Sequence, residues 1–191
     1  MNKLSVLQNV KTVFTHPYPH ICIDEALPHD IYDELDATFP EELICSTTPH
    51  DGGICYRYKA KECAQEAPPA IWQDFFAYHT SQEYFQECAR LFEPHIVEAY
   101  GDEFMHDMLT KDVSVRDVDT GEIKEVNKSL GRQVDDDLHS PVKTVPYNRN
   151  TFCMFLNVKD SVHSVSPRLQ PTQRRRSINI IGEFNGTGKM W

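Results

Sequence analysis

A histidine, an arginine and a serine near the C-terminus have the types and spacing to hold a metal ion and a carboxylate. His163 follows a run of apolar residues, and Arg175 opens another such run twelve residues later. A neutral imidazole is a common metal ligand, and a guanidinium binds a carboxylate through two parallel hydrogen bonds. Alternation along a strand puts Arg175, Ser177 and Asn179 on one face. We therefore predict that Arg175 and Ser177 bind one carboxylate and that His163 is a metal ligand.

Strands are the elements predicted to position these residues. Apolar and polar residues alternate after residue 113, and β-branched and aromatic residues concentrate in segments 142–147, 151–158 and 177–184. Such runs favour half-buried strands. The three consecutive arginines 174–176 precede the last run, and its alternation turns Arg175 away from both neighbours. This arrangement predicts a carboxylate partner on one face and solvent on the other.

The N-terminal part has mainly helical signals. Residues 18–24 predict an entering strand, and Leu27-Pro28 predicts the start of a helix that ends at Pro40. Segment 41–69 is predicted to be irregular. Helical periodicity returns at Pro69, and Thr80 with Glu83 forms a capping-box pattern that predicts another helix start. We therefore predict a single α+β domain over 1–191, with a helical support region at 1–110 and a β region at 111–191.

The two ends of the chain resemble the iron(II)- and 2-oxoglutarate-dependent dioxygenases, in particular the prolyl 4-hydroxylase-like group and its small phage-type relatives. The similar segments are 17–24 with the helix after Leu27, and the region that contains His163, Arg175 and Ser177. The resemblance implies that the C-terminal part is a double-stranded β-helix, or jelly roll. It implies Fe(II) as cofactor and 2-oxoglutarate as co-substrate. His163 is then the distal metal ligand, Arg175 binds the 5-carboxylate, and Ser177 is its partner.

The proximal metal ligands of that family have no direct counterpart. None of the nine histidines is followed two residues later by Asp or Glu. Asp137 and His139 have suitable residue types in reversed order, and a strand would project both to one face. They are candidate metal ligands, and a solvated acidic turn is the alternative for that segment. For His163 the alternative is a hydrogen-bonded histidine at the start of a strand.

The preferred functional prediction is a 2-oxoglutarate/Fe(II) oxygenase that hydroxylates a peptidyl or small-molecule substrate. The alternative is a catalytically inactive β-helix protein with a binding or structural role, which kept Arg175 and lost the iron site. The residues after 113 are barely enough for eight strands and their connections, which indicates a shortened β-helix. A third interpretation, a metal-independent binding protein unrelated to this family, leaves the spacing of the three residues unexplained. Neither the substrate nor the oligomeric state follows from the sequence.

Composition excludes several classes of protein. The 191 residues carry 29 acidic and 19 basic side chains, which gives a formal net charge of −10. Such a balance argues against a nucleic-acid or anionic membrane partner, because phosphates require clustered lysine and arginine. No export signal or long apolar segment is present, so we predict a cytoplasmic protein. The six cysteines form no Cys-x-x-Cys pair and are predicted to be reduced, mostly buried thiols.

Overall fold

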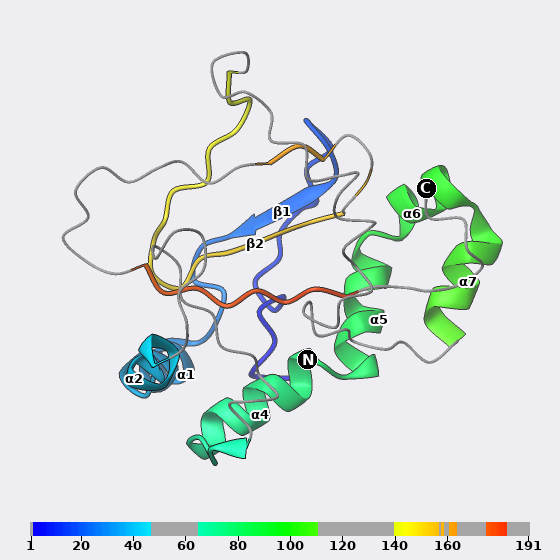
Figure 1. Cartoon of the computed structure of the whole chain (residues 1–191). Helices are drawn as coiled ribbons and strands as arrows, with labels where there is room; N and C mark the ends of the chain where they lie inside the picture. The colour runs from blue at the N-terminus through cyan, green and yellow to red at the C-terminus, as the bar shows by residue number, and fades with distance from the viewer. Residues whose placement is uncertain are drawn as a thin grey trace.

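The structure, a computed structural model, combines helices with a small sheet. It describes residues 2–46, 65–110, 140–156, 158, 161–163 and 175–182. Among these residues no helix is long and apolar enough to cross a membrane. The elements in chain order are β1 (His20–Ile23), α1 (His29–Ala37), α2 (Glu41–Cys45), α4 (Ala70–His79), α5 (Gln82–Leu91), α6 (Glu93–Tyr100), α7 (Asp102–Thr110) and β2 (Phe152–Phe155) (Figure 1).

The two strands join the beginning of the chain to its C-terminal part. β1 and β2 pair antiparallel, with His20 opposite Phe155 and Ile23 opposite Phe152. One face of the sheet carries Ile21 and Ile23, which are 1% and 5% exposed and belong to the core. The opposite face carries His20 and Cys22, as the alternation of side chains requires. The predicted strands at 18–24 and 151–158 are therefore confirmed in shortened form.

Prolines mark the starts of the first helices. α1 begins directly after Pro28, whose backbone is extended (φ −53°, ψ 144°), and Asp30 lies in its first turn. An acidic side chain there is favoured by the helix dipole. Leu35 is the buried residue of α1. α2 follows Pro40 and occupies part of the segment that was predicted to be irregular.

The boundary between α4 and α5 differs by one residue from the prediction. Ser81 is the N-cap of α5, and its hydroxyl accepts a hydrogen bond from the main-chain N–H of Tyr84 at 3.2 Å. Thr80 instead ends α4, where its hydroxyl donates to the main-chain oxygen of Phe76 at 2.8 Å. The predicted start at Thr80 is therefore one residue too early, because serine and threonine both suit an N-cap and residue type does not distinguish position 80 from position 81.

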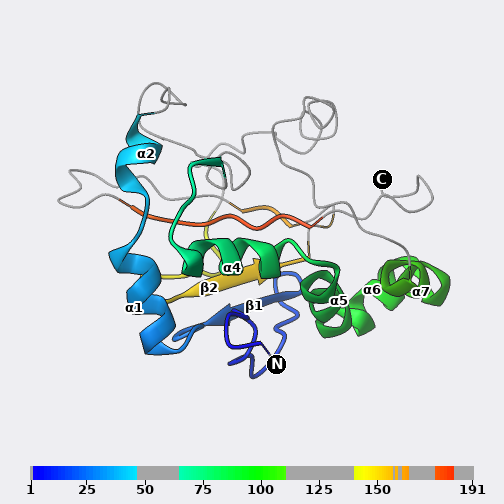
Figure 2. The same cartoon turned by 90° about the horizontal axis from the view of Figure 1, so that it is seen from below.

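Trp72 connects α4 with the end of α1. The indole is 2% exposed, and its Nε1–H donates to the main-chain oxygen of Thr38 at 3.1 Å. Its ring contacts those of Phe39, Phe75 and Phe76. Trp72 thus packs α4 against the end of α1, and Figure 2 shows these two helices next to each other.

Asn150 fastens the start of β2 to the chain before α1. Its side-chain oxygen accepts from Leu27 N–H at 2.9 Å, and its side-chain nitrogen donates to Leu27 O at 2.8 Å. Its own main-chain oxygen accepts from Ala26 N–H at 2.9 Å. The backbone at Asn150 has φ 53°, a conformation that asparagine tolerates better than most residues. The Asn150 side chain thus makes the two hydrogen bonds to the Leu27 main chain that a paired strand would otherwise make at this end of the ladder.

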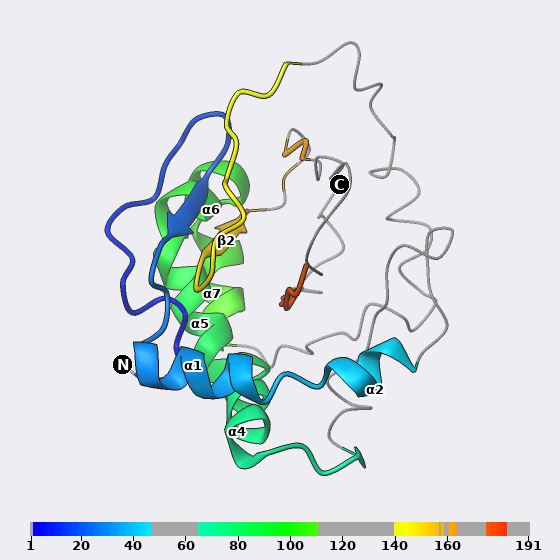
Figure 3. The same ribbon diagram turned by 90° about the vertical axis from the view of Figure 1, so that its left-hand side faces the viewer.

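The predicted double-stranded β-helix is not what the structure shows. The described residues contain six helices and only the two-stranded antiparallel sheet. Segment 142–147 and the described part of 177–184 form no strand, and Figure 3 shows 175–182 separate from the β1–β2 pair. Alternation indicates that a segment suits a half-buried strand, but a strand forms only where a partner edge is available. Val142 and Ile178 remain 65% and 40% exposed.

Candidate functional site

Three of the five predicted site residues lie in the described part of the chain. These are His163, Arg175 and Ser177, whereas Asp137 and His139 lie outside it. Among the described residues, no hydrogen bond, ion pair or ring contact joins His163 to Arg175 or Ser177. The two halves of the predicted site are therefore not joined by a described contact.

Tyr147 positions the segment that contains Arg175 and Ser177. Its hydroxyl donates to the main-chain oxygen of Arg176 at 2.6 Å and accepts from the main-chain N–H of Arg176 at 2.8 Å. The guanidinium of Arg175 lies over the Tyr147 ring, 4.6 Å from its centroid. A cation–π contact of this kind holds the guanidinium by its face and leaves its N–H donors available.

Two other arginines of the C-terminal segments, Arg149 and Arg176, form ion pairs with acidic side chains of the N-terminal helices. Arg176 contacts Glu41, with 3.0 Å between its Nε and a carboxylate oxygen, and Asp36, with 3.2 Å between its Nη1 and a carboxylate oxygen. The hydrogen bond to Glu41 is the main cause that raises the pKa of Arg176. Arg149 lies 3.2 Å from both Asp33 and Asp36. These ion pairs dock the C-terminal segments onto α1 and α2.

Arg175 differs from these two arginines because it has no acidic partner among the described residues. It is exposed, and its one described contact is the Tyr147 ring. The carboxylate partners that the structure shows belong to Arg176, and binding of a carboxylate by Arg175 stays a prediction. Ser177 is also exposed, and its hydroxyl makes no hydrogen bond to a described residue. The segment follows an extended path in Figure 1.

His163 is oriented by its own backbone and by an aromatic ring. Its Nδ1 lies 2.9 Å from the main-chain oxygen of Ser161, and its ring centroid is 4.6 Å from that of Phe155. Because a carbonyl oxygen only accepts, this contact places the proton on Nδ1 and leaves Nε2 with a free lone pair. Metal-binding histidines are commonly oriented in this way.

Tyr18 contributes to the same orientation. Its hydroxyl donates to the main-chain oxygen of Val162 at 3.2 Å, and its ring lies 5.7 Å from that of Phe155. Burial, followed by the nearby Cys153, raises the pKa of Tyr18. The strand entry therefore supports the segment that carries His163. Sequence analysis missed this role, because the partner lies far along the chain.

The described residues do not by themselves fit an iron site. They contain no group of three or more His, Cys, Asp or Glu side chains that could hold a metal ion. His163 would supply one nitrogen ligand, and an iron site of the predicted type needs three protein ligands. No reaction step through a metal is therefore derived from this geometry.

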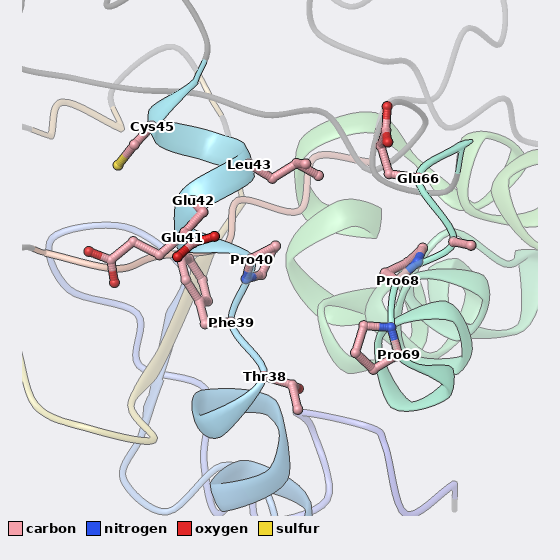
Figure 4. A pocket seen from close by; sticks show the side chains of 11 residues that line it. Thr38, Phe39, Pro40, Glu41, Glu42, Leu43, Cys45, Glu66, Pro68 and Pro69 are labelled. Atoms are coloured by element: carbon pink, nitrogen blue, oxygen red, sulfur yellow. The ribbon is translucent and has the colours of Figure 1, made fainter.

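An open hollow of about 800 Å³ lies at the edge of the N-terminal helices. Figure 4 shows that it opens between α2 and the segment around Pro68 and Pro69. Its lining includes Glu41, Glu42 and Glu66. These carboxylates disfavour an anion, so the hollow is a poor site for the predicted co-substrate.

A pair of cysteines on the exposed sheet face was also missed. Cys22 lies opposite Cys153 in the β1–β2 register, with 3.5 Å between the two sulfur atoms. The described cysteines are free thiols, of which Cys153 is exposed and Cys22, Cys45 and Cys88 are partly buried. The described cysteines form no disulfide bond in the structure and are less buried than predicted. Only the strand register, which the sequence does not give, could have identified the pair.

Comparison with known proteins does not assign the chain to a family. No family model, curated protein or solved structure matches the chain. The resemblance to the 2-oxoglutarate oxygenases therefore depends on the types and order of His163, Arg175 and Ser177.

Proposed function

We propose that the protein binds 2-oxoglutarate through Arg175 and Ser177, in the manner of the co-substrate site of a 2-oxoglutarate-dependent oxygenase. The observation that carries the proposal is the difference among the arginines of the C-terminal segments. Arg149 and Arg176 are paired with acidic side chains, whereas Arg175 lies on the Tyr147 ring without an acidic partner among the described residues. A guanidinium without an acidic partner among the described residues suits a carboxylate, and Ser177, two residues along the chain, is the candidate second donor.

Local charge supports the same choice. The chain has a formal net charge of −10, which disfavours a dianion over most of its surface. A dicarboxylate therefore needs a cation that is not already neutralised. Among the described residues no acidic side chain pairs with Arg175, and the cation–π contact lowers the loss of side-chain freedom on binding because the guanidinium is already held.

The proposed activity is hydroxylation of a peptidyl or small-molecule substrate with Fe(II) as cofactor. His163 supports it, because the contact with Ser161 leaves its Nε2 lone pair free for a metal. When bound, the metal would supply the activation of dioxygen. The competing function is binding without catalysis, which is favoured by the lack of a three-ligand group among the described residues.

Calorimetric titration tests the carboxylate site. We expect 2-oxoglutarate to bind more tightly than 2-oxobutyrate, which lacks the second carboxylate. In Arg175→Gln the affinity for 2-oxoglutarate should fall by about 10- to 100-fold, since a hydrogen-bonded charge contributes about 1.5–3 kcal/mol. The variant should bind the two ligands about equally. A wild-type protein that does not distinguish the two ligands would contradict the proposal.

Arg149→Gln is the matched control. Arg149 is also an exposed arginine over a tyrosine ring, 5.3 Å from the centroid of Tyr32, but it is paired with Asp33 and Asp36. Its replacement should leave 2-oxoglutarate affinity unchanged. Equal losses in both variants would show a general charge effect and overturn the assignment to Arg175.

A second measurement separates the two functions. Manganese(II), as a stand-in for iron, is titrated with and without 2-oxoglutarate, and conversion of 2-oxoglutarate to succinate is measured with Fe(II). Metal binding that His163→Ala abolishes, together with succinate formation, is expected for an oxygenase. Binding of 2-oxoglutarate without metal binding or turnover would establish the non-catalytic function instead.

A further inference from the structure

Cys22 and Cys153 occupy one cross-strand position of the sheet. The sulfur atoms are 3.5 Å apart, and the residues are separated by 131 positions in the chain. The main-chain N–H of Leu156 donates to the oxygen of Pro19 at 3.0 Å, which makes that opposite pair a hydrogen-bonded one. Hydrogen-bonded and non-hydrogen-bonded pairs alternate along an antiparallel ladder. Three positions further along, the cysteines therefore form a non-hydrogen-bonded pair.

That position has the backbone geometry of a disulfide. Non-hydrogen-bonded pairs place their Cα atoms about 4.5 Å apart, within the range of about 4.4–6.8 Å found for disulfides. The side chains project to the same face, so a rotation about the side-chain bonds suffices to bring the sulfur atoms together. We propose that Cys22 and Cys153 are a site of reversible oxidation to an intrachain disulfide by low-molecular-weight disulfides. This proposal is independent of 2-oxoglutarate binding.

Access is provided from the outer face of the sheet. Cys153 is exposed and Cys22 is partly buried, so a small disulfide reaches Cys153 first. Lys143 lies next to this face, with its Nζ 4.3 Å from the centroid of Phe14. Its charge lowers the pKa of Cys153, but burial and the neighbouring Cys22 outweigh it and raise that pKa to about 12. Exchange is therefore expected to accelerate as the pH rises, because the thiolate is the nucleophile.

The reaction balances with one disulfide molecule as oxidant. Cys153 loses its proton to solvent, and its thiolate attacks one sulfur of RS–SR, which forms a mixed disulfide and releases RS⁻. The thiolate of Cys22 then attacks the Cys153 sulfur and releases the second RS⁻. Both leaving groups take up the protons that the two cysteines lost. The protein is oxidised by two electrons, and RS–SR is reduced to two RSH.

The native fold should make the pairing of Cys22 with Cys153 selective. In the native sheet the two thiols are adjacent, whereas in the unfolded chain they are separated by a long loop whose closure is unfavourable. Six cysteines allow 15 complete sets of pairings in a denatured chain. Selective formation of the Cys22–Cys153 bond is therefore a property of the register that the structure shows.

The test uses the full chain in buffers with graded ratios of oxidised to reduced glutathione. After alkylation of free thiols, digestion and mass spectrometry, we expect one peptide pair linked through Cys22 and Cys153. In concentrated urea the same buffers should give mixed pairings without this preference. A Cys22–Cys153 link that is absent in the native protein, or no more abundant than other links, would overturn the proposal.

Serine variants provide the controls. Cys153→Ser and Cys22→Ser should each abolish the linked pair, and Cys22→Ser should accumulate a glutathione adduct at Cys153. Cys45→Ser, which changes a partly buried cysteine on α2, should leave the link unchanged. Adducts at both cysteines of the wild-type chain without the link would show that the two thiols react independently and would also overturn the proposal.

Discussion

Acidification is expected to destabilise the protein through His79. This side chain is 3% exposed, and its Nδ1 lies 2.8 Å from the main-chain oxygen of Phe75. Its Nε2 is buried with no hydrogen-bond partner in the described part of the chain. The rings of Phe75 and Tyr84 lie 4.0 and 4.6 Å from it. A protonated imidazole would thus place a charge and a second N–H among aromatic rings.

The magnitude follows from the pKa of His79. Burial lowers this pKa from 6.5 to about 4, although the Phe75 carbonyl and the charge of Glu87 act in the opposite direction. Between these two values the unfolded chain binds a proton that the folded chain does not. Stability is therefore full above about pH 6.5 and decreases as the pH falls toward about 4. The difference in unfolding free energy is about 3 kcal/mol, at about 1.4 kcal/mol per pKa unit.

Urea unfolding of the wild type and of His79→Phe across this pH range measures the effect. Phenylalanine keeps a ring among the aromatic neighbours and removes the titration. Carboxylates that titrate in the same range act in both proteins, so the difference between the two curves isolates His79. His106→Gln removes an exposed histidine on α7 and is the control with an unchanged pH dependence. Parallel curves for the wild type and His79→Phe would refute the reasoning.

Two further predictions concern side chains that connect distant segments. Asn150→Ala should lower the unfolding free energy by about 3 kcal/mol, because it removes two hydrogen bonds to the buried Leu27 main chain and leaves alanine at a positive φ. Asn150→Asp keeps the oxygen that accepts from Leu27 N–H, so urea unfolding should show a smaller decrease in unfolding free energy than for Asn150→Ala. An equal decrease in the two variants would contradict this account. Tyr147→Phe keeps the ring under Arg175 but removes both hydrogen bonds to Arg176. Calorimetry should then show weaker 2-oxoglutarate binding with nearly unchanged stability, and unchanged affinity would contradict the positioning role of the hydroxyl.

Local signals were sufficient for several elements of the fold. Pro28 and Pro69 each precede a helix, and the β-branched and aromatic residues of 18–24 and 151–158 include the two strands. These signals depend on neighbours in sequence. The jelly roll was predicted wrongly because alternation in 142–147 and 177–184 specifies which face of a strand is buried and not whether a partner strand exists.

The candidate site was predictable only in part for the same reason. Arg175 and Arg176 have different partners, a tyrosine ring and two carboxylates, but the strand on which the prediction depended does not form. The sequence could not show that Asp36 and Glu41 neutralise Arg176 or that Tyr147 fixes its main chain, because these contacts join segments more than 25 residues apart. Pairing between distant segments is a property of the folded chain.

Charge in the N-terminal helices determines what the C-terminal arginines can bind. Asp36 pairs with both Arg149 and Arg176, so α1 holds two separate segments through one acidic side chain. These pairs are partly or fully exposed, so solvent screens them and each contributes little to stability. Their larger consequence is electrostatic: among the described residues they neutralise Arg149 and Arg176, so a dicarboxylate that binds as we propose would find its favourable contact at Arg175.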